Sequence, residues 1–553
     1  MCVIFNKGVK HMNTTSTSAI PRADYPEQVG VSSVDIAAYI RDLKESGIEA
    51  HSIMVIRDGK VAFETWREPY TPDMPHAMYS VSKSITSIAA GFAIDEGYFK
   101  LETKVLDIFP EFRTENYDEK LEKITVRHLL NMTAGKDVSL LTDKSKGNWQ
   151  KQFFDSKWYA DPDDGEWRYI SECSYMVCAC IKRTTGMSVL SFLTPRLFEP
   201  LGFGRVPFWE VDGEGIEAGG WGIYMTTEEL AKVALCVFNK GVYEGKQVIP
   251  AAWIAEATRK QANPERYSEI DNRAGYGYFF WRNGVVPNSF RMDGMFSQFA
   301  VCFEDYNAIV VVTSCEIEEQ KSRDCLWRHF PAAFLPHAQS DKNYIQYKDK
   351  LVLETLEELH EMPHSVLEQT IAEREITFKK PVLINTVNFP VSMLPLASVY
   401  MSADRAGNID KVSFRFEDDV CYMTWTEGEA VNTIACGMDG TPRHSQIHLA
   451  GIDFTARCSA AWESENSLAI WFRPMESVCQ RRWTFVFEEN GNVQAIPRSM
   501  PSIKTMVKYL CDSMDDFIDS KAVSGAAKTA AMKMYGIVEP IHRGRFTDTL
   551  ASE

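Results

Sequence analysis

Ser80 and Lys83 stand three residues apart at the start of an apolar run with a helical pattern, within the segment Met78 to Gly91. Residues at this spacing lie side by side on one helix face, which brings a hydroxyl next to an amine. A serine hydroxyl needs a base within hydrogen-bond reach to become nucleophilic, and a lysine can be that base when desolvation lowers its pKa. The pair therefore contains both groups that an acyl-enzyme mechanism requires.

Further segments follow this pair in the order found in one superfamily. The stretch from Ser80 to Phe112 and the run from Lys123 to Gly135 resemble the serine β-lactamase, penicillin-binding protein and family VIII carboxylesterase superfamily. Its Tyr-x-Asn element falls on Tyr169-Ile170-Ser171, so the tyrosine is kept and Ser171 replaces the asparagine. The resemblance covers about residues 30 to 335 and implies a β-lactamase-like α+β domain.

The resemblance also implies a role for each of these residues. Ser80 would attack the substrate carbonyl, and Tyr169 would be the general base that takes the Ser80 proton and returns it to the leaving group. A phenol with a pKa of about 10 can do so only next to a cation such as Lys83. The N–H groups of Ser80 and Phe296 would hold the oxyanion, and water would then release the acyl group.

The superfamily's third element, Lys-Thr-Gly or His-x-Gly, aligns with Asp293-Gly294-Met295, in the register set by an Ala-Gly-Gly segment at Ala218. A lysine or histidine there can hold a substrate carboxylate, whereas an aspartate would repel it. We therefore expect Asp293 to favour a neutral substrate or one with an amino group. The alternative is that Asp293 only pairs with a nearby cation, either Arg291 or Lys83.

The sequence thus predicts a serine hydrolase for a small ester or amide, with no cofactor. Two alternatives stay open: a β-lactamase or D-amino-acid peptidase, and a non-catalytic binding protein on the same fold. A zinc site is not expected, because Pro363 interrupts the His-Glu-x-x-His pattern that begins at His360. We expect core or surface positions for the remaining clusters of metal-ligand residue types, which are Cys173, Cys178 and Cys180, and His444 with His448.

The elements that must position these residues begin with a hairpin. Two apolar runs, His51 to Arg57 and Lys60 to Trp66, flank Asp58-Gly59, a strong two-residue turn signal. Helical patterns follow at 82–97, 125–132, 173–185, 227–239 and 251–260, and strand patterns return at 276–281, 298–303 and 308–314. Strands, then helices, then strands predict an α+β domain whose sheet is closed by the late strands.

A second domain is expected further along the chain. After helical stretches near 322–334 and 348–361 come short alternating runs, such as those at 397–401, 411–416, 420–425 and 468–472. This pattern predicts an all-β barrel or sandwich, similar in placement to lipocalin-like C-terminal domains on some of these hydrolases. The expected boundaries are an extension at 1–25, the hydrolase domain at 26–340, a helical connector at 341–379, the all-β domain at 380–500 and a helical tail at 501–553.

Composition limits the partners. The 59 Lys and Arg residues against 76 Asp and Glu residues give a formal charge of −17, which disfavours nucleic acid. The longest strongly apolar stretch, near Ala308 to Val312, is far shorter than the roughly 20 residues that span a bilayer. The 13 cysteines lack the spacing of a disulfide scaffold. We expect a cytoplasmic protein that acts on a small molecule and has no membrane partner. A homo-oligomer is compatible with these observations.

Overall fold

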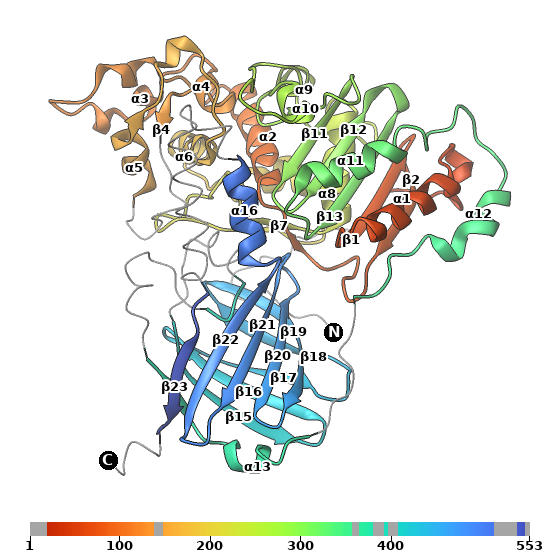
Figure 1. Cartoon of the computed structure of the whole chain (residues 1–553). Coiled ribbons are helices and arrows are strands. Elements are labelled where there is room, and N and C mark those ends of the chain that lie inside the picture. The colour runs from red at the N-terminus through yellow and green to blue at the C-terminus, as the bar shows by residue number, and fades with distance from the viewer. Residues whose placement is uncertain are drawn as a thin grey trace. The chain divides into compact units, whose positions relative to one another are not determined.

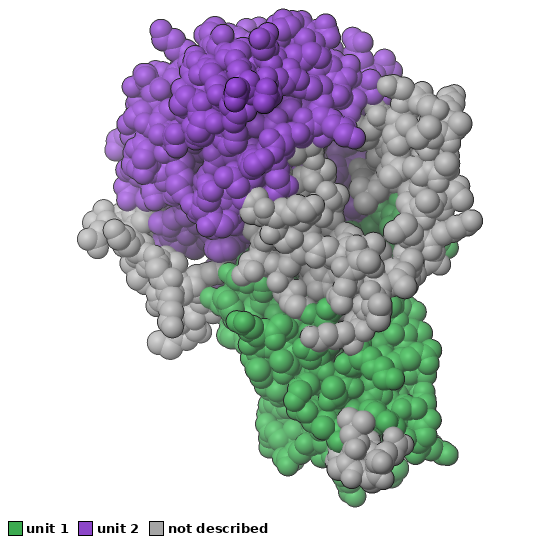
Figure 2. All heavy atoms as spheres, turned by 90° about the vertical axis from the view of Figure 1, so that its left-hand side faces the viewer, with its two compact units in different colours: residues 1–5, 356–553 green, residues 6–355 purple. Residues whose placement is uncertain are grey.

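The computed structural model describes residues 19–137, 148–356, 364–379, 392–395, 408–513 and 539–547. The chain forms two compact units, one within residues 6–355 and the other within residues 356–553, coloured separately in Figure 2. The first unit carries all the predicted catalytic residues, and the second is built mainly from strands (Figure 1).

A six-stranded antiparallel sheet with the order β10-β11-β12-β13-β1-β2 forms the centre of the first unit (Figure 1). Its strands are β1 (Ala50–Arg57), β2 (Lys60–Trp66), β10 (Trp281–Arg282), β11 (Ser289–Gly294), β12 (Gln298–Phe303) and β13 (Ala308–Ser314). Asp58 and Gly59 form the predicted turn, both at positive φ, and β1 pairs with β13. The late strands therefore complete the sheet that the N-terminal hairpin begins, as predicted.

Helices cover both faces of this sheet. On one face α1 (Ser33–Glu45) and α11 (Glu319–His329) share an apolar core with side chains of β1, β12 and β13, such as Phe299 and Val301. On the other face lies α8 (Thr227–Phe238), where Thr227 Oγ1 is 2.7 Å from Ser52 Oγ of β1. Burial on both faces explains why the central strands are continuous apolar runs rather than alternating ones.

Apart from α12 (Lys342–Tyr347), the remaining α-helices of the first unit lie between β2 and β10 in the sequence. They are α2 (Val81–Asp95), α3 (Val105–Ile108), α4 (Val126–Leu130), α5 (Trp149–Asp155), α6 (Ser171–Thr185), α7 (Val189–Leu193), α9 (Ala251–Thr258) and α10 (Ile270–Arg273). The helices predicted from 82 to 260 correspond to α2, α4, α6, α8 and α9. The strand predicted at 276–281 is wrong for most of its length, because Phe279 has a φ of 65° and the Gly277 N–H donates to the Phe280 carbonyl in a tight turn.

Short paired segments complete the first unit. They are β3 (His76–Ala77), β6 (Phe208–Trp209) and β7 (Ile223–Met225) in one small sheet, β4 (Lys136–Asp137) with β5 (Lys157–Trp158), and β8 (Val242–Tyr243) with β9 (Lys246–Gln247). Of the helix predicted at 348–361, only a single 3-10 turn at Lys348–Lys350 is present, after α12 (Lys342–Tyr347). Residues 357–361 lie outside the described part of the chain.

The second unit is a ten-stranded sheet with the order β17-β16-β15-β14-β23-β22-β21-β20-β19-β18, which closes through a pairing of β17 with β19. Its elements are α13 (Glu368–Ile371), β14 (Ile376–Phe378), β15 (Ile409–Glu417), β16 (Val420–Glu427), β17 (Ala430–Gly437), β18 (Arg443–Leu449), β19 (Ile452–Ser464), β20 (Ser467–Pro474), β21 (Gln480–Phe487), β22 (Asn492–Met500), α16 (Ile503–Ser513) and β23 (His542–Phe546). This confirms the predicted all-β domain.

The ends of this unit differ in part from the prediction. The strand predicted at 397–401 lies outside the described residues, as does the predicted helical tail beyond α16. β23, which the sequence patterns do not indicate, pairs with β14 and β22 inside the sheet. Where β17 meets β18, the Asn432 side chain bonds both the N–H and the carbonyl of His448, each at 3.0 Å.

No single helix among the described residues is both long enough and apolar enough to cross a membrane, although one bent pair, Ser171–Thr185 with Val189–Phe198, passes that test together.

Candidate active site

Ser80 lies at the N-terminal end of α2, in a segment whose backbone is fixed from several sides. Tyr79, directly before it, has a φ of 44°, a left-handed conformation that is uncommon for a residue other than glycine. The Tyr79 carbonyl accepts a 2.6 Å hydrogen bond from Ser82 Oγ, and the Met78 N–H donates to the Ile223 carbonyl of β7 at 3.0 Å. These contacts present the Ser80 side chain at the beginning of the helix.

Lys83 is the immediate neighbour of the Ser80 hydroxyl. Its Nζ is 2.9 Å from Ser80 Oγ and donates to the Gly220 carbonyl at 2.7 Å, while the residue is only 1% exposed. Burial lowers the pKa of Lys83 to about 7, and the nearby carboxylate of Glu172 only partly opposes this shift. A large fraction of Lys83 is therefore neutral near pH 7, as a base for Ser80 must be.

Tyr169 stands on the other side of Lys83. The Lys83 Nζ lies 4.7 Å from the centre of the Tyr169 ring, and that ring stacks on Trp281 with centroids 5.6 Å apart. Burial raises the pKa of Tyr169 well above its usual range, and a hydrogen bond with Ser80 opposes this only in part. The role of Tyr169 as the general base stays a prediction. The direction of the two pKa shifts makes Lys83 the group of this pair that loses its proton more readily.

The end of β11 lies close to the backbone of Met78 and Ser80. β10 pairs with β11 only at Phe290 and Arg291, so the following residues of β11 have no β10 partner. A Cβ on Gly294 would lie 2.3 Å from the Met78 carbonyl oxygen and 3.2 Å from the Ser80 nitrogen, so only glycine allows this approach.

The backbone N–H groups of Ser80 and Phe296 belong to the two segments that meet here. Phe296 has a φ of 62°, and its ring lies 5.3 Å from the ring of Tyr79 between centroids. Among the hydrogen bonds of the described residues, none uses the N–H of Ser80 or of Phe296 as a donor. Neither N–H group is used by these hydrogen bonds, and the oxyanion role expected of both stays a prediction.

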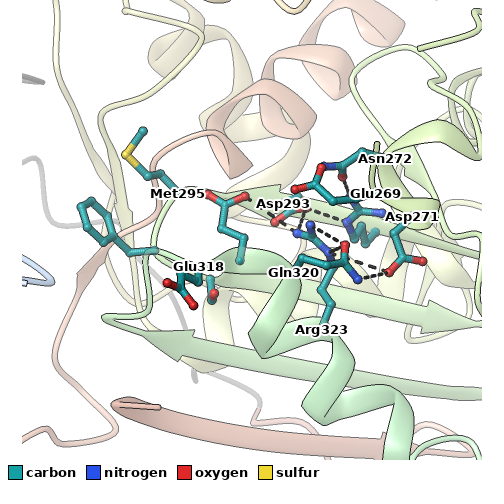
Figure 3. Close-up of polar contacts among 12 residues, drawn as sticks. Glu269, Asp271, Asn272, Asp293, Met295, Glu318, Gln320 and Arg323 are labelled. Atoms are coloured by element: carbon teal, nitrogen blue, oxygen red, sulfur yellow. Dashed lines mark hydrogen bonds and ion pairs between the residues drawn. The ribbon is translucent and has the colours of Figure 1, made fainter. Parts of the chain in front are cut away.

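Ser171 and Met295 lie at the border of this arrangement. Ser171 is the first residue of α6, and its Cβ would be 2.9 Å from a Cβ added to Gly220, the residue whose carbonyl holds Lys83. Met295, labelled in Figure 3, directly follows Gly294 in the turn after β11. Its carbonyl accepts from Gln298 Nε2 at 3.3 Å. The structure thus brings both predicted residues next to the catalytic group without giving either a contact to Ser80.

Asp293 is held by two arginines. Its Oδ2 accepts from Arg291 Nε at 2.6 Å and from an Arg323 guanidinium nitrogen at 3.3 Å, between β11 and α11 (Figure 3). The pairing with Arg291 that the sequence left open is therefore present. Asp293 is not an isolated negative charge, and the expectation that it alone repels anions has to be revised to include both guanidinium groups.

Sequence reasoning missed three residues of the site. Gly220 was used only to set the register, although its carbonyl anchors Lys83, and a Cβ there would lie 2.8 Å from Ser174 Oγ. Arg323 and Glu319 come from α11, which follows Asp293 in the sequence by about 30 residues, so no local pattern connects them to it.

Within the described residues, no group of three or more His, Cys, Asp or Glu side chains is arranged to hold a metal ion.

Comparison with known proteins identifies relatives of the first unit. The sequence model of the Beta-lactamase family matches residues 36–329. The chain is 24% identical over 294 residues to a 6-aminohexanoate-dimer hydrolase from Paenarthrobacter ureafaciens, covering 48% of this chain and 74% of that protein. It is 26% identical over 167 residues to a beta-lactamase of Escherichia coli (strain K12), covering 29% of this chain and 43% of that protein.

One similar solved structure is that of a family VIII carboxylesterase, which is 17% identical in sequence and superposes with a TM-score of 0.45. The matched region covers 56% of this chain and 99% of the carboxylesterase chain. A penicillin-binding protein homolog from Caulobacter crescentus is 16% identical with a TM-score of 0.44, covering 54% of this chain and 98% of its own.

Proposed function

Because the chain belongs to the Beta-lactamase family, whose model matches more than half of its 553 residues, we propose that it is a serine hydrolase acting through an acyl-enzyme on a small ester or amide. Its first unit has the β-lactamase/transpeptidase-like α+β fold. The observation that carries the proposal is the 2.9 Å contact between Ser80 Oγ and the buried amine of Lys83.

In the proposed reaction, Lys83 enters as the neutral amine and takes the proton of Ser80 as Oγ attacks the substrate carbonyl. The N–H groups of Ser80 and Phe296 hold the oxyanion of the tetrahedral intermediate. Tyr169, kept neutral by burial, gives a proton to the leaving group and is reprotonated from Lys83. A water molecule then attacks the acyl carbonyl by the reverse proton path and releases the acid.

Two observations support the proposed substrate class: the names of relatives, and the residue found where the superfamily has its Lys-Thr-Gly or His-x-Gly segment. The names of two relatives, a 6-aminohexanoate-dimer hydrolase and a lovastatin esterase from Penicillium rubens, describe an amide-dimer hydrolase and an esterase. The position of the superfamily's Lys or His is held by Asp293, paired with Arg291. We therefore propose that β-lactams, which carry a carboxylate, are poorer substrates than uncharged esters and amides.

The test compares initial rates on p-nitrophenyl acetate, p-nitrophenyl butyrate and a chromogenic cephalosporin. We expect Ser80→Ala to abolish ester hydrolysis. Ser87→Ala is the matched control, because Ser87 is a buried hydroxyl on the same helix whose Oγ has no hydrogen-bond partner among the described residues.

Mass spectrometry of the protein after a fluorophosphonate probe should place the adduct on the peptide that contains Ser80. Equal ester rates for the native protein and Ser80→Ala would refute the proposal and favour a binding protein on this fold. Efficient cephalosporin turnover would favour the β-lactamase alternative.

A further inference from the structure

A buried group of charges lies beside Tyr169, between β11 and the first turn of α11. It contains the guanidinium groups of Arg291 and Arg323 and the carboxyl groups of Asp271, Asp293 and Glu319 (Figure 3). Arg291 and Arg323 are 0% and 1% exposed, so their charges need partners within the protein. The number of carboxyl groups exceeds the number of guanidinium groups by one.

Asp271 has a structural role in this group, because both of its carboxylate oxygens accept hydrogen bonds from other parts of the protein. Its Oδ1 accepts from the N–H groups of Gly284 and Val285, at 2.9 and 3.2 Å. Its Oδ2 accepts from Trp327 Nε1 at 2.7 Å and from Gln320 at 3.1 Å. Both oxygens are therefore occupied, and Asp271 has no capacity left for a ligand.

Asp293 and Glu319, in contrast, have acceptor capacity left. Asp293 is 7% exposed, yet its Oδ1 has no hydrogen-bond partner among the described residues, while Oδ2 takes both arginines. Glu319 reaches Arg323 only at 3.8 Å, and 20% of its side chain is exposed. A buried acceptor without a partner costs about 1 to 3 kcal/mol, so such an atom in a site calls for a donor from a ligand.

Both carboxyl groups act on the charge of Tyr169. The charges of Asp293 and Glu319 each raise the pKa of the Tyr169 phenol, which in turn hydrogen-bonds with Ser80. The Tyr169 ring stacks on Trp281, and this pair adds aromatic faces to the same region. A cation here would meet two carboxyl groups and π-electron density within the site of hydrolysis.

We propose that Asp293 and Glu319 form a subsite for an ammonium group on the substrate, so that the enzyme prefers esters and amides whose acyl or leaving group carries a primary amine. This rests on the proposed hydrolase function and narrows its substrate class. Glu319 supplies the negative charge when the ammonium group binds and the carboxyl ionises, and Asp293 Oδ1 supplies a fixed acceptor. The two arginines hold Asp293 in place. When all three carboxyl groups are ionised, the two positive charges leave one negative charge uncompensated.

The charge state of Glu319 fits this subsite. Burial, together with the charge of Asp293, raises the pKa of Glu319 to about 8, although Arg323 and Arg291 oppose the shift. The empty site is therefore close to neutral at pH 7. An arriving ammonium favours the ionised carboxylate, so its binding displaces a proton from Glu319.

The kinetic test uses two pairs of p-nitroanilides that differ in one amino group: 4-aminobutanoyl against butanoyl, and 6-aminohexanoyl against hexanoyl. We expect the native enzyme to prefer one amino substrate over its neutral partner by about tenfold or more in kcat/KM. Glu319→Gln should remove most of that preference, read as the ratio of kcat/KM between the amino substrate and its neutral partner within each pair. Glu318→Gln is the matched control, since Glu318 is exposed and directly precedes Glu319.

A binding measurement separates this subsite from the hydrolase function itself. Calorimetry of n-butylammonium binding to the native protein, in two buffers of different ionisation enthalpy at pH 7, should show proton release that Glu319→Gln abolishes. No preference for the amino substrates, or a preference unchanged in Glu319→Gln, would overturn the subsite while leaving Ser80-dependent hydrolysis in place. If no anilide or ester is hydrolysed through Ser80, the hydrolase proposal fails and the calorimetry decides the subsite alone.

Discussion

The pKa of Lys83 gives the most direct test of the chemistry proposed here. If Lys83 takes the Ser80 proton, kcat/KM must follow the neutral fraction of its amine. With a pKa of about 7, that fraction is roughly 10% at pH 6 and 90% at pH 8, so the rate should rise about ninefold and then level off. An unshifted lysine, with a pKa near 10.4, would instead give a rise of about 100-fold over this range and no plateau.

The perturbation that checks this reasoning is Lys83→Arg. A guanidinium stays protonated throughout this pH range, so the variant keeps a cation beside Ser80 but has no base there. We expect kcat/KM to fall by about 100 to 10,000-fold and the inflection near pH 7 to disappear. Rates on p-nitrophenyl butyrate from pH 5.5 to 9.5, corrected with Ser80→Ala at each pH, measure both effects. A native profile that is flat, that rises without a plateau, or that Lys83→Arg retains would refute the assignment.

The same shift has a consequence for stability. The unfolded chain holds the Lys83 proton up to about pH 10.5, whereas the folded protein releases it near pH 7. Between these values the unfolded state binds more protons, so this residue makes the folded protein more stable as pH rises. Relative to Lys83→Met, the native free energy of unfolding should increase by up to about 1.4 kcal/mol per pH unit between pH 8 and 10, as measured by urea denaturation.

Three further predictions concern the surroundings of Ser80. Gly294→Ala should lower kcat/KM for ester hydrolysis by about 100-fold or more. The new Cβ would lie 2.3 Å from the Met78 carbonyl oxygen and would displace the end of β11, which leads to the proposed oxyanion donor at Phe296. A variant with native ester rates would contradict this prediction. Tyr169→Phe should slow alkyl esters by about 100-fold but p-nitrophenyl esters far less, since only the poorer leaving group needs a proton; equal losses would argue against proton donation. Arg323→Met should cost about 3 to 5 kcal/mol in chemical denaturation, because it removes the arginine beside Glu319 and one of the two arginines that pair with Asp293; an unchanged midpoint would contradict this reading.

The sequence was sufficient where function depends on local spacing. Ser80 and Lys83 are three residues apart on α2, so helix geometry alone brings them together. Asp58-Gly59 predicts the hairpin because both turn residues require positive φ, and the alternating runs after residue 408 predict the strands of the second unit. In each case the information lies within about ten consecutive residues.

Sequence reasoning was weaker where burial and distant segments decide the chemistry. The pKa of Tyr169 depends on how completely the fold encloses it, which a single sequence does not show, and burial raises this pKa. Arg323 approaches Asp293 only because α11 crosses the face of the sheet to which Asp293 points. β23 joins its sheet from the far end of the chain, and its five residues, with a central glycine, carry a weak strand pattern.

The closing seam of the second unit has a consequence for how that sheet comes apart. Neighbouring strands in the described order are joined by backbone ladders. At the closing edge, β17 pairs with β19 at a single position, Gly437 with Ser459, and meets β18 through side chains: the Asn432 amide on His448, and Ser445 Oγ accepting from the Ala435 N–H at 2.8 Å. Side-chain bonds at a seam can break one at a time, without the cooperativity of a ladder. Solvent deuterium should therefore enter the backbone amides along this line first, and Asn432→Ala should accelerate exchange there while leaving the β20–β21 ladder protected.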